Sequence, residues 1–262
     1  MTSDLPGVDA AVENGLLRVT LNRPARMNAV TTESLVAVAD AFASHAGDPS
    51  VRAAVLTGAG RAFCTGADLA TDPTAGPPSA ATIDAANRTA AAIRAFPRPV
   101  VGAVNGPVAG VGVSLALACD LTVATESSYL LLAFTKVGLM PDGGATALVA
   151  ASIGRARALK MALLAERLPA PEAVSAGLIA DVYPDDEFAN AVEDLTHRLV
   201  TGPTGAYRWT KYAVNDATLT ELDNAFTRER KGQLELLASA DFEEGVAAFL
   251  AKRPAVFGNV RG

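Results

Sequence analysis

The longest uncharged segment of the sequence constrains the fold more than any other feature. Residues 99–119 contain no Asp, Glu, Lys or Arg, and about 20 apolar residues are enough for a helix to cross a membrane. Asn105-Gly106-Pro107 interrupts the segment with a strong turn signal, and a turn exposed to lipid would leave its backbone polar groups without hydrogen bonds. We therefore expect a buried strand at 99–104, a turn, a buried helix from about 111 to 118, and no membrane segment.

Apolar patterns on either side of this segment predict an α/β core. Residues 16–21 alternate between apolar and polar side chains as a half-buried strand does, and residues 31–44 place apolar side chains at helical spacing behind a capping Thr. The segments 51–56 and 120–125 are short and apolar, which is typical of buried strands. In contrast, residues 71–79 contain so much Pro and Gly that we expect a mobile loop.

The chain beyond residue 153 is predicted to be mostly helical. The expected helices are 154–165, 170–176, 185–200, 203–216, 218–239 and 241–251, with a strand-like break at 178–183. We therefore divide the chain into a core, residues 1–200, and a C-terminal helical region, residues 201–262, that caps the core or assembles with other subunits. The apolar faces of this region require cover, and they are formed by Leu219, Leu222, Phe226, Leu234 and Leu237.

Composition and charge exclude several classes of protein. Half of the 262 residues are apolar, which is enough for a sizeable core, and a net charge of −6 argues against a general nucleic-acid-binding protein. Cys64 and Cys119 are too few for a disulfide framework, and neither has metal-ligand spacing to His45 or His197, so we expect no metal site. The N-terminal residues lack the features of a signal peptide, which indicates a cytoplasmic protein.

Two glycine-rich turns, each after an expected strand, are the candidates for chemistry. They cover residues 56–69 and 103–112, and their glycines allow the backbone to turn sharply and to approach a ligand closely. Either turn alone has an equally good structural explanation. The second lacks the third glycine of a dinucleotide-binding fingerprint, because none stands three residues after Gly112.

Taken together and in order, these segments resemble the crotonase (enoyl-CoA hydratase/isomerase) superfamily along nearly the whole chain. Residues 21–29 resemble its opening loop, residues 62–69 and 103–120 its two glycine-rich site segments, and residues 249–257 its C-terminal signature. The resemblance implies a ββα superhelix core with a C-terminal helical region that forms a homotrimer or a dimer of trimers. It also implies an acyl-CoA substrate, with coenzyme A as part of the substrate and no tightly bound cofactor.

The resemblance assigns an oxyanion hole to the backbone amides of Ala67 and Val111. Such a hole binds the thioester oxygen and stabilises the enolate formed when a proton leaves the neighbouring carbon. The amide of Val111 stands where a helix begins, so the helix does not use it and the helix dipole adds to its effect. The other positions expected to contact the substrate are Arg26, Met27, Ala29, Cys64, Gly66, Asp68, Leu69, Gly110, Ser114, Phe134 and Lys252.

The side chains around this hole favour isomerisation over hydration. Hydratases of the superfamily carry two glutamates where this chain has Ser114 and Phe134, whereas Asp142 stands where several isomerases carry a single acid. One acid is sufficient to move a double bond, because it takes a proton from one carbon and returns it to another. We therefore expect a 3,2-enoyl-CoA isomerase or an isomerase of a ring-type epoxyacyl-CoA, with Asp142 as the proton shuttle.

Two other functions remain open at this point. A hydratase or related lyase of fatty-acid metabolism would need displaced carboxylates, for which Asp68 and Glu126 are available. A non-catalytic acyl-CoA-binding protein would keep the hole and lack the acids. Local sequence also permits Asp142 to be a turn or helix-capping residue and Asp68 to brace its turn.

Overall fold

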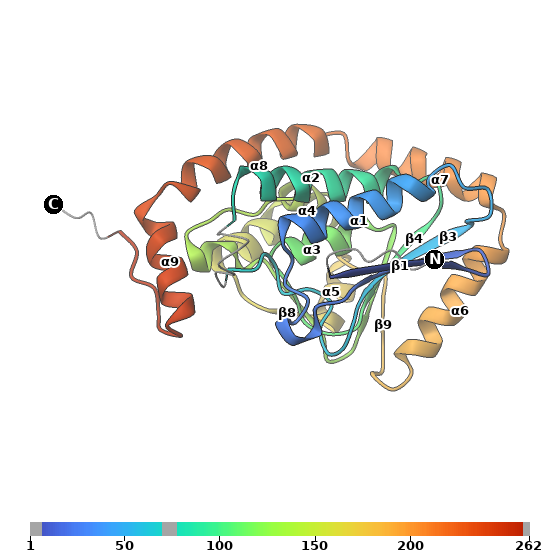
Figure 1. Cartoon of the computed structure of the whole chain (residues 1–262), viewed down its shortest axis with the longest axis horizontal. Coiled ribbons are helices and arrows are strands. Elements are labelled where there is room, and N and C mark those ends of the chain that lie inside the picture. The colour runs from blue at the N-terminus through green and yellow to red at the C-terminus, as the bar shows by residue number, and fades with distance from the viewer. Residues whose placement is uncertain (1–6, 70–77, 259–262) are drawn as a thin grey trace.

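The computed structural model describes residues 7–69 and 78–258 (Figure 1). The loop expected at 71–79 therefore lies outside the described residues, apart from its last two positions. Within the described ranges the chain forms a mixed α/β structure with a six-stranded and a three-stranded sheet.

The main sheet has the strand order β1-β2-β3-β4-β6-β9. Its strands are β1 Val8–Glu13, β2 Leu16–Leu21, β3 Ala53–Gly58, β4 Val100–Val104, β6 Leu121–Thr125 and β9 Asp181–Tyr183. β1 and β2 pair antiparallel, and the other neighbouring strands are parallel. The β1–β2 turn is Asn14-Gly15, with φ angles of 50° and 84°, as a tight hairpin of this type requires.

Helices cover both faces of the main sheet. α1 (Thr32–His45) and α2 (Ala80–Ala95) pack against each other on one face, and α6 (Phe188–Thr201) covers the other. Successive side chains of a strand point to opposite faces, so Leu56 of β3 joins the cluster under α1 and α2 whereas Val55 packs with α6. Burial on both faces explains why these strands read as continuous apolar segments.

The uncharged segment 99–119 folds as predicted, into β4, a turn and the buried helix α3 (Val111–Ala118). Between them, β5 (Val108–Ala109) pairs with β7 (Tyr129–Leu131), which in turn pairs with β8 (Leu168–Pro169). Among the described residues, no helix is both long enough and apolar enough to cross a membrane.

The second half of the chain is helical, as predicted, with shifted boundaries. α4 (Ala145–Leu164) begins nine residues before the expected position and bends at Gly154, where φ is 75°. The remaining elements are the 3₁₀ helices η1 Pro24–Arg26 and η2 Ala133–Val137, and the helices α5 Ala170–Ala176, α7 Thr204–Thr218, α8 Leu222–Leu237 and α9 Ala240–Leu250.

The apolar face of α8 is covered by the chain itself. α8 lies along α2 and also contacts α4 (Figure 1). Leu222 belongs to the main buried cluster, and Leu219, Phe226 and Leu237 pack against it. The cover that these four side chains require is therefore supplied by the core of the same chain.

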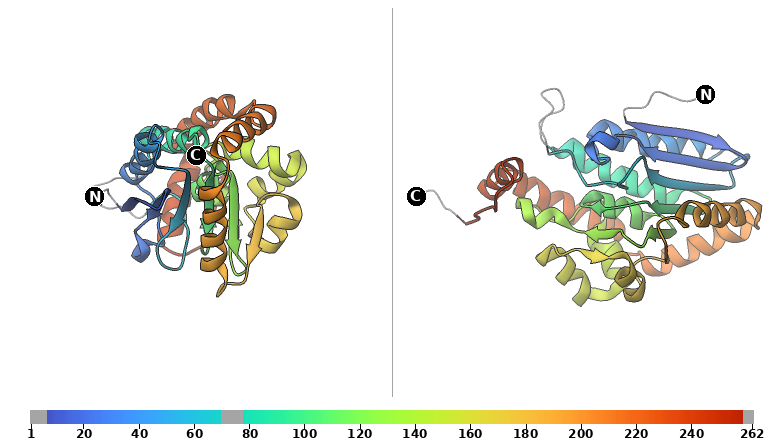
Figure 2. Two further views of the ribbon diagram at one scale, coloured as in Figure 1. Left: turned by 90° about the vertical axis from the view of Figure 1, so that its right-hand side faces the viewer. Right: turned by 90° about the horizontal axis from the view of Figure 1, so that it is seen from below.

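Large exposed apolar side chains occur on α4, on α7 and around the end of α9. Trp209, Tyr212 and Val214 of α7 are 55–64% exposed, and Phe249 and Leu250 of α9 are 48–57% exposed. α7 and α9 lie at opposite ends of the molecule (Figures 1 and 2).

Candidate active site

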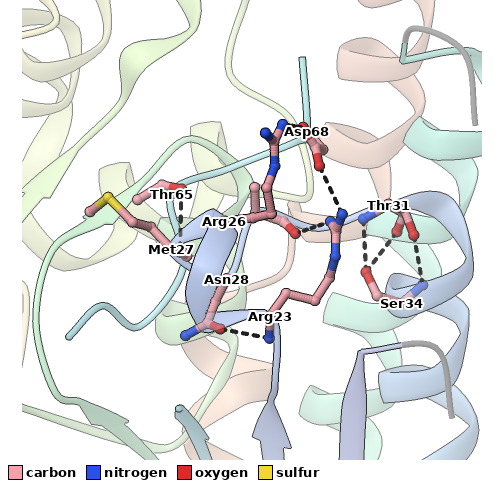
Figure 3. A network of polar contacts seen from close by, with 9 residues as sticks. Arg23, Arg26, Met27, Asn28, Thr31, Ser34, Thr65 and Asp68 are labelled. Atoms are coloured by element: carbon pink, nitrogen blue, oxygen red, sulfur yellow. Dashed lines mark hydrogen bonds and ion pairs between the residues drawn. The ribbon is translucent and has the colours of Figure 1, made fainter. Parts of the chain in front are cut away.

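The opening loop and the first glycine-rich segment are held together by a carboxylate between two guanidinium groups. Nη2 of Arg23 lies 2.9 Å from Oδ2 of Asp68, and Nη2 of Arg26 lies 2.7 Å from Oδ1 (Figure 3). Burial opposes ionisation of Asp68, but hydrogen bonds and charge from Arg26 and Arg23 hold its pKa below the ordinary value. Asp68 therefore braces the turn as a paired anion.

Asn28 makes a second connection between these segments. Its side chain is 1% exposed, and its Nδ2 donates to the carbonyl oxygens of Ala59 and Ala62 at 2.9 and 2.7 Å. Thr65 Oγ1 also donates to the carbonyl oxygen of Met27 at 3.2 Å (Figure 3). The shape of the first glycine-rich segment is thus set by contacts with the opening loop.

The amide of Ala67 is left available by the way its segment pairs. Val30 N–H donates to Gly66 O, and Asp68 N–H donates to Val30 O, both at 2.9 Å. Ala67 stands between these two bonds in a parallel bridge, so its own N–H points away from Val30. Within the described residues this N–H donates to no acceptor.

The second glycine-rich segment brings a similar amide to the same place. Gly110 has φ 56° and precedes the first residue of α3, Val111, whose N–H also donates to no acceptor in the described part of the chain. A Cβ on Gly110 would lie 3.3 Å from Gly66 Cα, and a Cβ on Gly66 would lie 3.3 Å from the carbonyl oxygen of Ala109. The two turns therefore contact each other through glycines, and both amides belong to residues that line one cavity.

This cavity has a volume of about 620 Å³ and a mostly apolar wall. Its apolar side chains include Leu35, Ile83, Phe134, Val137, Leu139, Leu237 and Phe249. Three basic side chains, Arg26, Arg61 and Lys136, line it as well and are exposed, which places them at its rim. Asp68 and Asp142 are the carboxylates of the lining among the described residues.

Asp142 is a buried acid with one oxygen bound and one oxygen unpartnered. Gln233 Nε2 of α8 donates to its Oδ2 at 2.7 Å, while Oδ1 is buried with no partner among the described residues. Burial raises the pKa of Asp142 to about 7, the Gln233 hydrogen bond lowers it, and the nearby charge of Glu229 raises it. Burial therefore favours the protonated form of this acid.

A second buried carboxylate on α8 fixes the turn that carries Asp142. Glu229 is 0% exposed and accepts hydrogen bonds from the backbone N–H groups of Gly144 and Thr146 at 2.7 and 2.9 Å. These amides open α4, whose N-cap residue Gly144 has no side chain to cap it. Glu229 thus acts as a capping carboxylate supplied by a distant helix.

Three residues expected to contact the substrate lie outside the cavity lining: Cys64, Ser114 and Lys252. Burial raises the pKa of the Cys64 thiol to about 12. Ser114 is fully buried and donates to the carbonyl oxygen of Asp142 at 2.6 Å, and Lys252 is exposed just after α9. The other predicted residues line the cavity, namely Arg26, Met27, Ala29, Gly66, Ala67, Asp68, Leu69, Gly110, Val111, Phe134 and Asp142.

Sequence reasoning missed the contributions of α2 and α8 to the site. Ile83 of α2 and Leu237 of α8 line the cavity, and Gln233 and Glu229 hold the acid and its turn. Polar residues on an amphipathic helix give no local signal of such a role. Within the described ranges, no three His, Cys, Asp or Glu side chains are grouped so that they could hold a metal ion.

Comparison with known proteins identifies the family of the chain. Residues 11–260 match the family model described as enoyl-CoA hydratase/isomerase. The chain is 39% identical over 251 residues to a 1,2-epoxyphenylacetyl-CoA isomerase of Escherichia coli (94% of this chain, 96% of the relative). It is 40% identical over 247 residues to a probable enoyl-CoA hydratase of Rhodobacter capsulatus (94% and 95%).

The fold comparison agrees. A crystal structure of an enoyl-CoA hydratase from Mycobacterium avium subsp. paratuberculosis superimposes with a TM-score of 0.91 and 49% identity, over 97% of this chain and 100% of the other. The mixed α/β architecture is therefore the crotonase fold predicted from the sequence. From its sequence and its fold, the chain belongs to the enoyl-CoA hydratase/isomerase family.

Proposed function

We propose that this protein isomerises an acyl-CoA thioester through an enolate, with Asp142 as the only proton shuttle. The observation that carries the proposal is the pair of carboxylates in the cavity. Asp68 is engaged by two arginines, so Asp142 is the carboxylate of the described lining that retains an unpartnered oxygen.

The proposed reaction needs two backbone amides and one carboxylate. The thioester oxygen accepts hydrogen bonds from the amides of Ala67 and Val111, while Asp142 removes a proton from one carbon and returns it to another. The product has the mass of the substrate. A donor of this kind lowers the barrier by about 3–4 kcal/mol, and a pKa of about 7 lets Asp142 both accept and donate a proton at neutral pH.

The cavity favours an uncharged, apolar acyl group. Aliphatic and aromatic side chains form most of its wall, and its basic side chains are confined to the exposed rim. Arg26, Arg61 and Lys136 there suit the phosphates of coenzyme A, since guanidinium and ammonium groups pair readily with phosphate. Double-bond migration in an enoyl-CoA and rearrangement of a ring-type epoxyacyl-CoA, the reaction type in the name of the E. coli relative, both suit this cavity.

Hydration is the second candidate, because other relatives are named hydratases. It would require a carboxylate that holds water. Of the two acids considered for that role, Glu126 is exposed and absent from the cavity lining, and Asp68 is paired. Phe134 lines the cavity at the position where hydratases of the family carry a glutamate, and an apolar ring offers no hydrogen bond that would hold a water molecule.

The family resemblance, together with the exposed apolar side chains of α7 and α9, leads us to propose a homotrimer or a dimer of trimers. Burial of Trp209 and Tyr212 against another subunit would remove the largest of them from water. Light scattering coupled to gel filtration gives the mass directly, and a monomer would contradict this proposal.

Paired 2-enoyl- and 3-enoyl-CoA substrates in heavy water test the reaction. We expect deuterium in the product, a shifted double bond and no added water, all lost in Asp142→Asn and retained in Asp194→Asn, which changes an exposed aspartate of α6. Addition of water that survives in Asp142→Asn would favour a hydratase. Binding without any exchange would indicate a carrier.

A further inference from the structure

Helix α8 determines which oxygen of Asp142 is free to react. Gln233 is 2% exposed and Asp142 is 8% exposed, so the contact between them is shielded from water. Gln233 makes two contacts with the turn that carries the acid. Its Oε1 accepts from the backbone N–H of Met140 at 3.3 Å, and its Nε2 donates to Asp142 Oδ2 at 2.7 Å.

These two contacts fix the orientation of the carboxamide. A backbone N–H can only donate, so the oxygen of Gln233 must face Met140 and its NH₂ group must face Asp142. An NH₂ group has no lone pair to offer, so Oδ2 of Asp142 always accepts from it. When Asp142 carries a proton, that proton must sit on Oδ1, which is buried and has no partner in the described part of the chain.

The close approach of α8 to this turn is built from small residues. A Cβ on Gly232 would lie 2.3 Å from Sδ of Met140, and a Cβ on Gly144 would lie 2.6 Å from Cδ1 of Leu222. Gly144 has φ 84° as well, so a side chain there is disfavoured twice. α8 therefore has little freedom to slide along this turn, and the position of Gln233 relative to Asp142 is fixed.

We infer that Gln233 is a positioning residue: it holds Asp142 Oδ2 as a permanent acceptor and thereby makes Oδ1 the oxygen that takes and returns the substrate proton. This inference rests on the proposed isomerase function. Gln233 is neutral, and the charge that acts on Asp142 comes from Glu229, on the same face of α8. Ser114 of α3 donates to the carbonyl oxygen of Asp142.

Two variants of Gln233 test whether it orients the carboxylate of Asp142 or only packs against it. Gln233→Leu removes both contacts, whereas Gln233→Glu keeps an acceptor for the Met140 N–H and replaces the NH₂ donor with a second carboxyl group, which repels the carboxylate of Asp142 when both are ionised. Without the donor the carboxylate is less stabilised, so the acidic limb of the kcat profile should move up by about one pH unit or more in both variants. We expect KM to stay within about twofold, because neither amide of the proposed hole is changed. Glu235→Leu, at an exposed position of the same helix, should match the wild type.

A measurement that does not depend on turnover completes the test. Infrared titration follows the carboxylic acid C=O band of Asp142, which is identified by its loss in Asp142→Asn. We expect the midpoint to move up in both Gln233 variants. If Gln233→Leu, which adds no acid of its own, keeps the wild-type midpoint and profile, Gln233 is only a structural contact and the inference is overturned. If the midpoint moves while Asp142→Asn remains active, the positioning holds and the proposed shuttle fails.

Discussion

Gln233 Nε2 donates a hydrogen bond of 2.7 Å to Oδ2 of Asp142, across 91 residues of sequence. Four residues earlier on α8, Glu229 holds the amides that follow Asp142 in the chain. The acid of the candidate site is thus completed by a C-terminal helix whose apolar face also packs on the core. The packing of α8 on the core therefore also places the side chains that orient Asp142.

Asp142 should destabilise the folded protein at alkaline pH. Its pKa is raised from 3.8 to about 7 in the folded state, so the folded state binds this proton more tightly than the unfolded chain does. The free energy of unfolding contributed by Asp142 therefore falls as the pH rises through this window. Asp142→Asn should unfold at a higher temperature than the wild type at pH 8, with a gain of at most about 4 kcal/mol, and the difference should shrink by pH 5. Calorimetry at the two pH values checks this, and a difference that grows toward pH 5 would contradict it.

Glu229→Gln should move the acidic limb of activity in the opposite direction to the Gln233 variants. Removing the nearby negative charge lowers the pKa of Asp142, so the limb should shift to lower pH. The variant also weakens the cap of α4, and we expect a loss of about 1–3 kcal/mol of stability. Kinetic profiles and thermal unfolding of the same preparations measure both effects. An unchanged profile would mean that the charge of Glu229 does not reach Asp142.

Gly66→Ala should impair catalysis beyond its effect on stability. The added Cβ meets the carbonyl oxygen of Ala109 at 3.3 Å and should displace the neighbouring Ala67 amide, lowering kcat by at least about 10-fold. Gly154→Ala is the matched control, because Gly154 also has positive φ but no atom within 4 Å of an added Cβ. Both variants should lose about 1–3 kcal/mol from backbone strain. Equal kcat values in the two would argue against the Ala67 amide as a donor.

Asp68→Asn should affect binding more than chemistry. The opening loop loses its carboxylate partner for Arg23 and Arg26, so we expect KM for the acyl-CoA to rise several-fold while kcat and its pH dependence stay close to the wild type. Steady-state kinetics across pH measure this. A collapse of kcat at unchanged KM would identify Asp68 as a base and revive the hydratase alternative.

The sequence predicted the core elements because their signals are local. Pro107 and the glycines around it break the uncharged segment, and α3 begins at Val111 as expected. The hairpin strand β1 was missed, although Asn14-Gly15 is a strong hairpin signal, because its apolar alternation is weak. The start of α4 was missed because its cap comes from Glu229 and not from a neighbouring residue.

Only those residues of the candidate site that belong to family motifs could be predicted from the sequence. Ala67, Val111 and Asp142 came from family resemblance, and all three line one cavity. Cys64 was expected there because it adjoins the first glycine-rich turn, and Ser114 because it stands where hydratases of the family carry a glutamate. Both side chains are fully buried outside the lining. Gln233 could not be found, since its role depends on which turn α8 crosses.

The transfer of a labelled proton within one substrate molecule tests the central claim most directly. A 3-enoyl-CoA that carries deuterium at C2 is incubated in ordinary water, and NMR locates the label in the product. A single buried shuttle with one free oxygen predicts that part of the deuterium reappears at C4 of the 2-enoyl-CoA, and that Asp142→Asn forms no product. A product heavier by one water, with no deuterium at C4 and formed equally well by Asp142→Asn, would contradict the account.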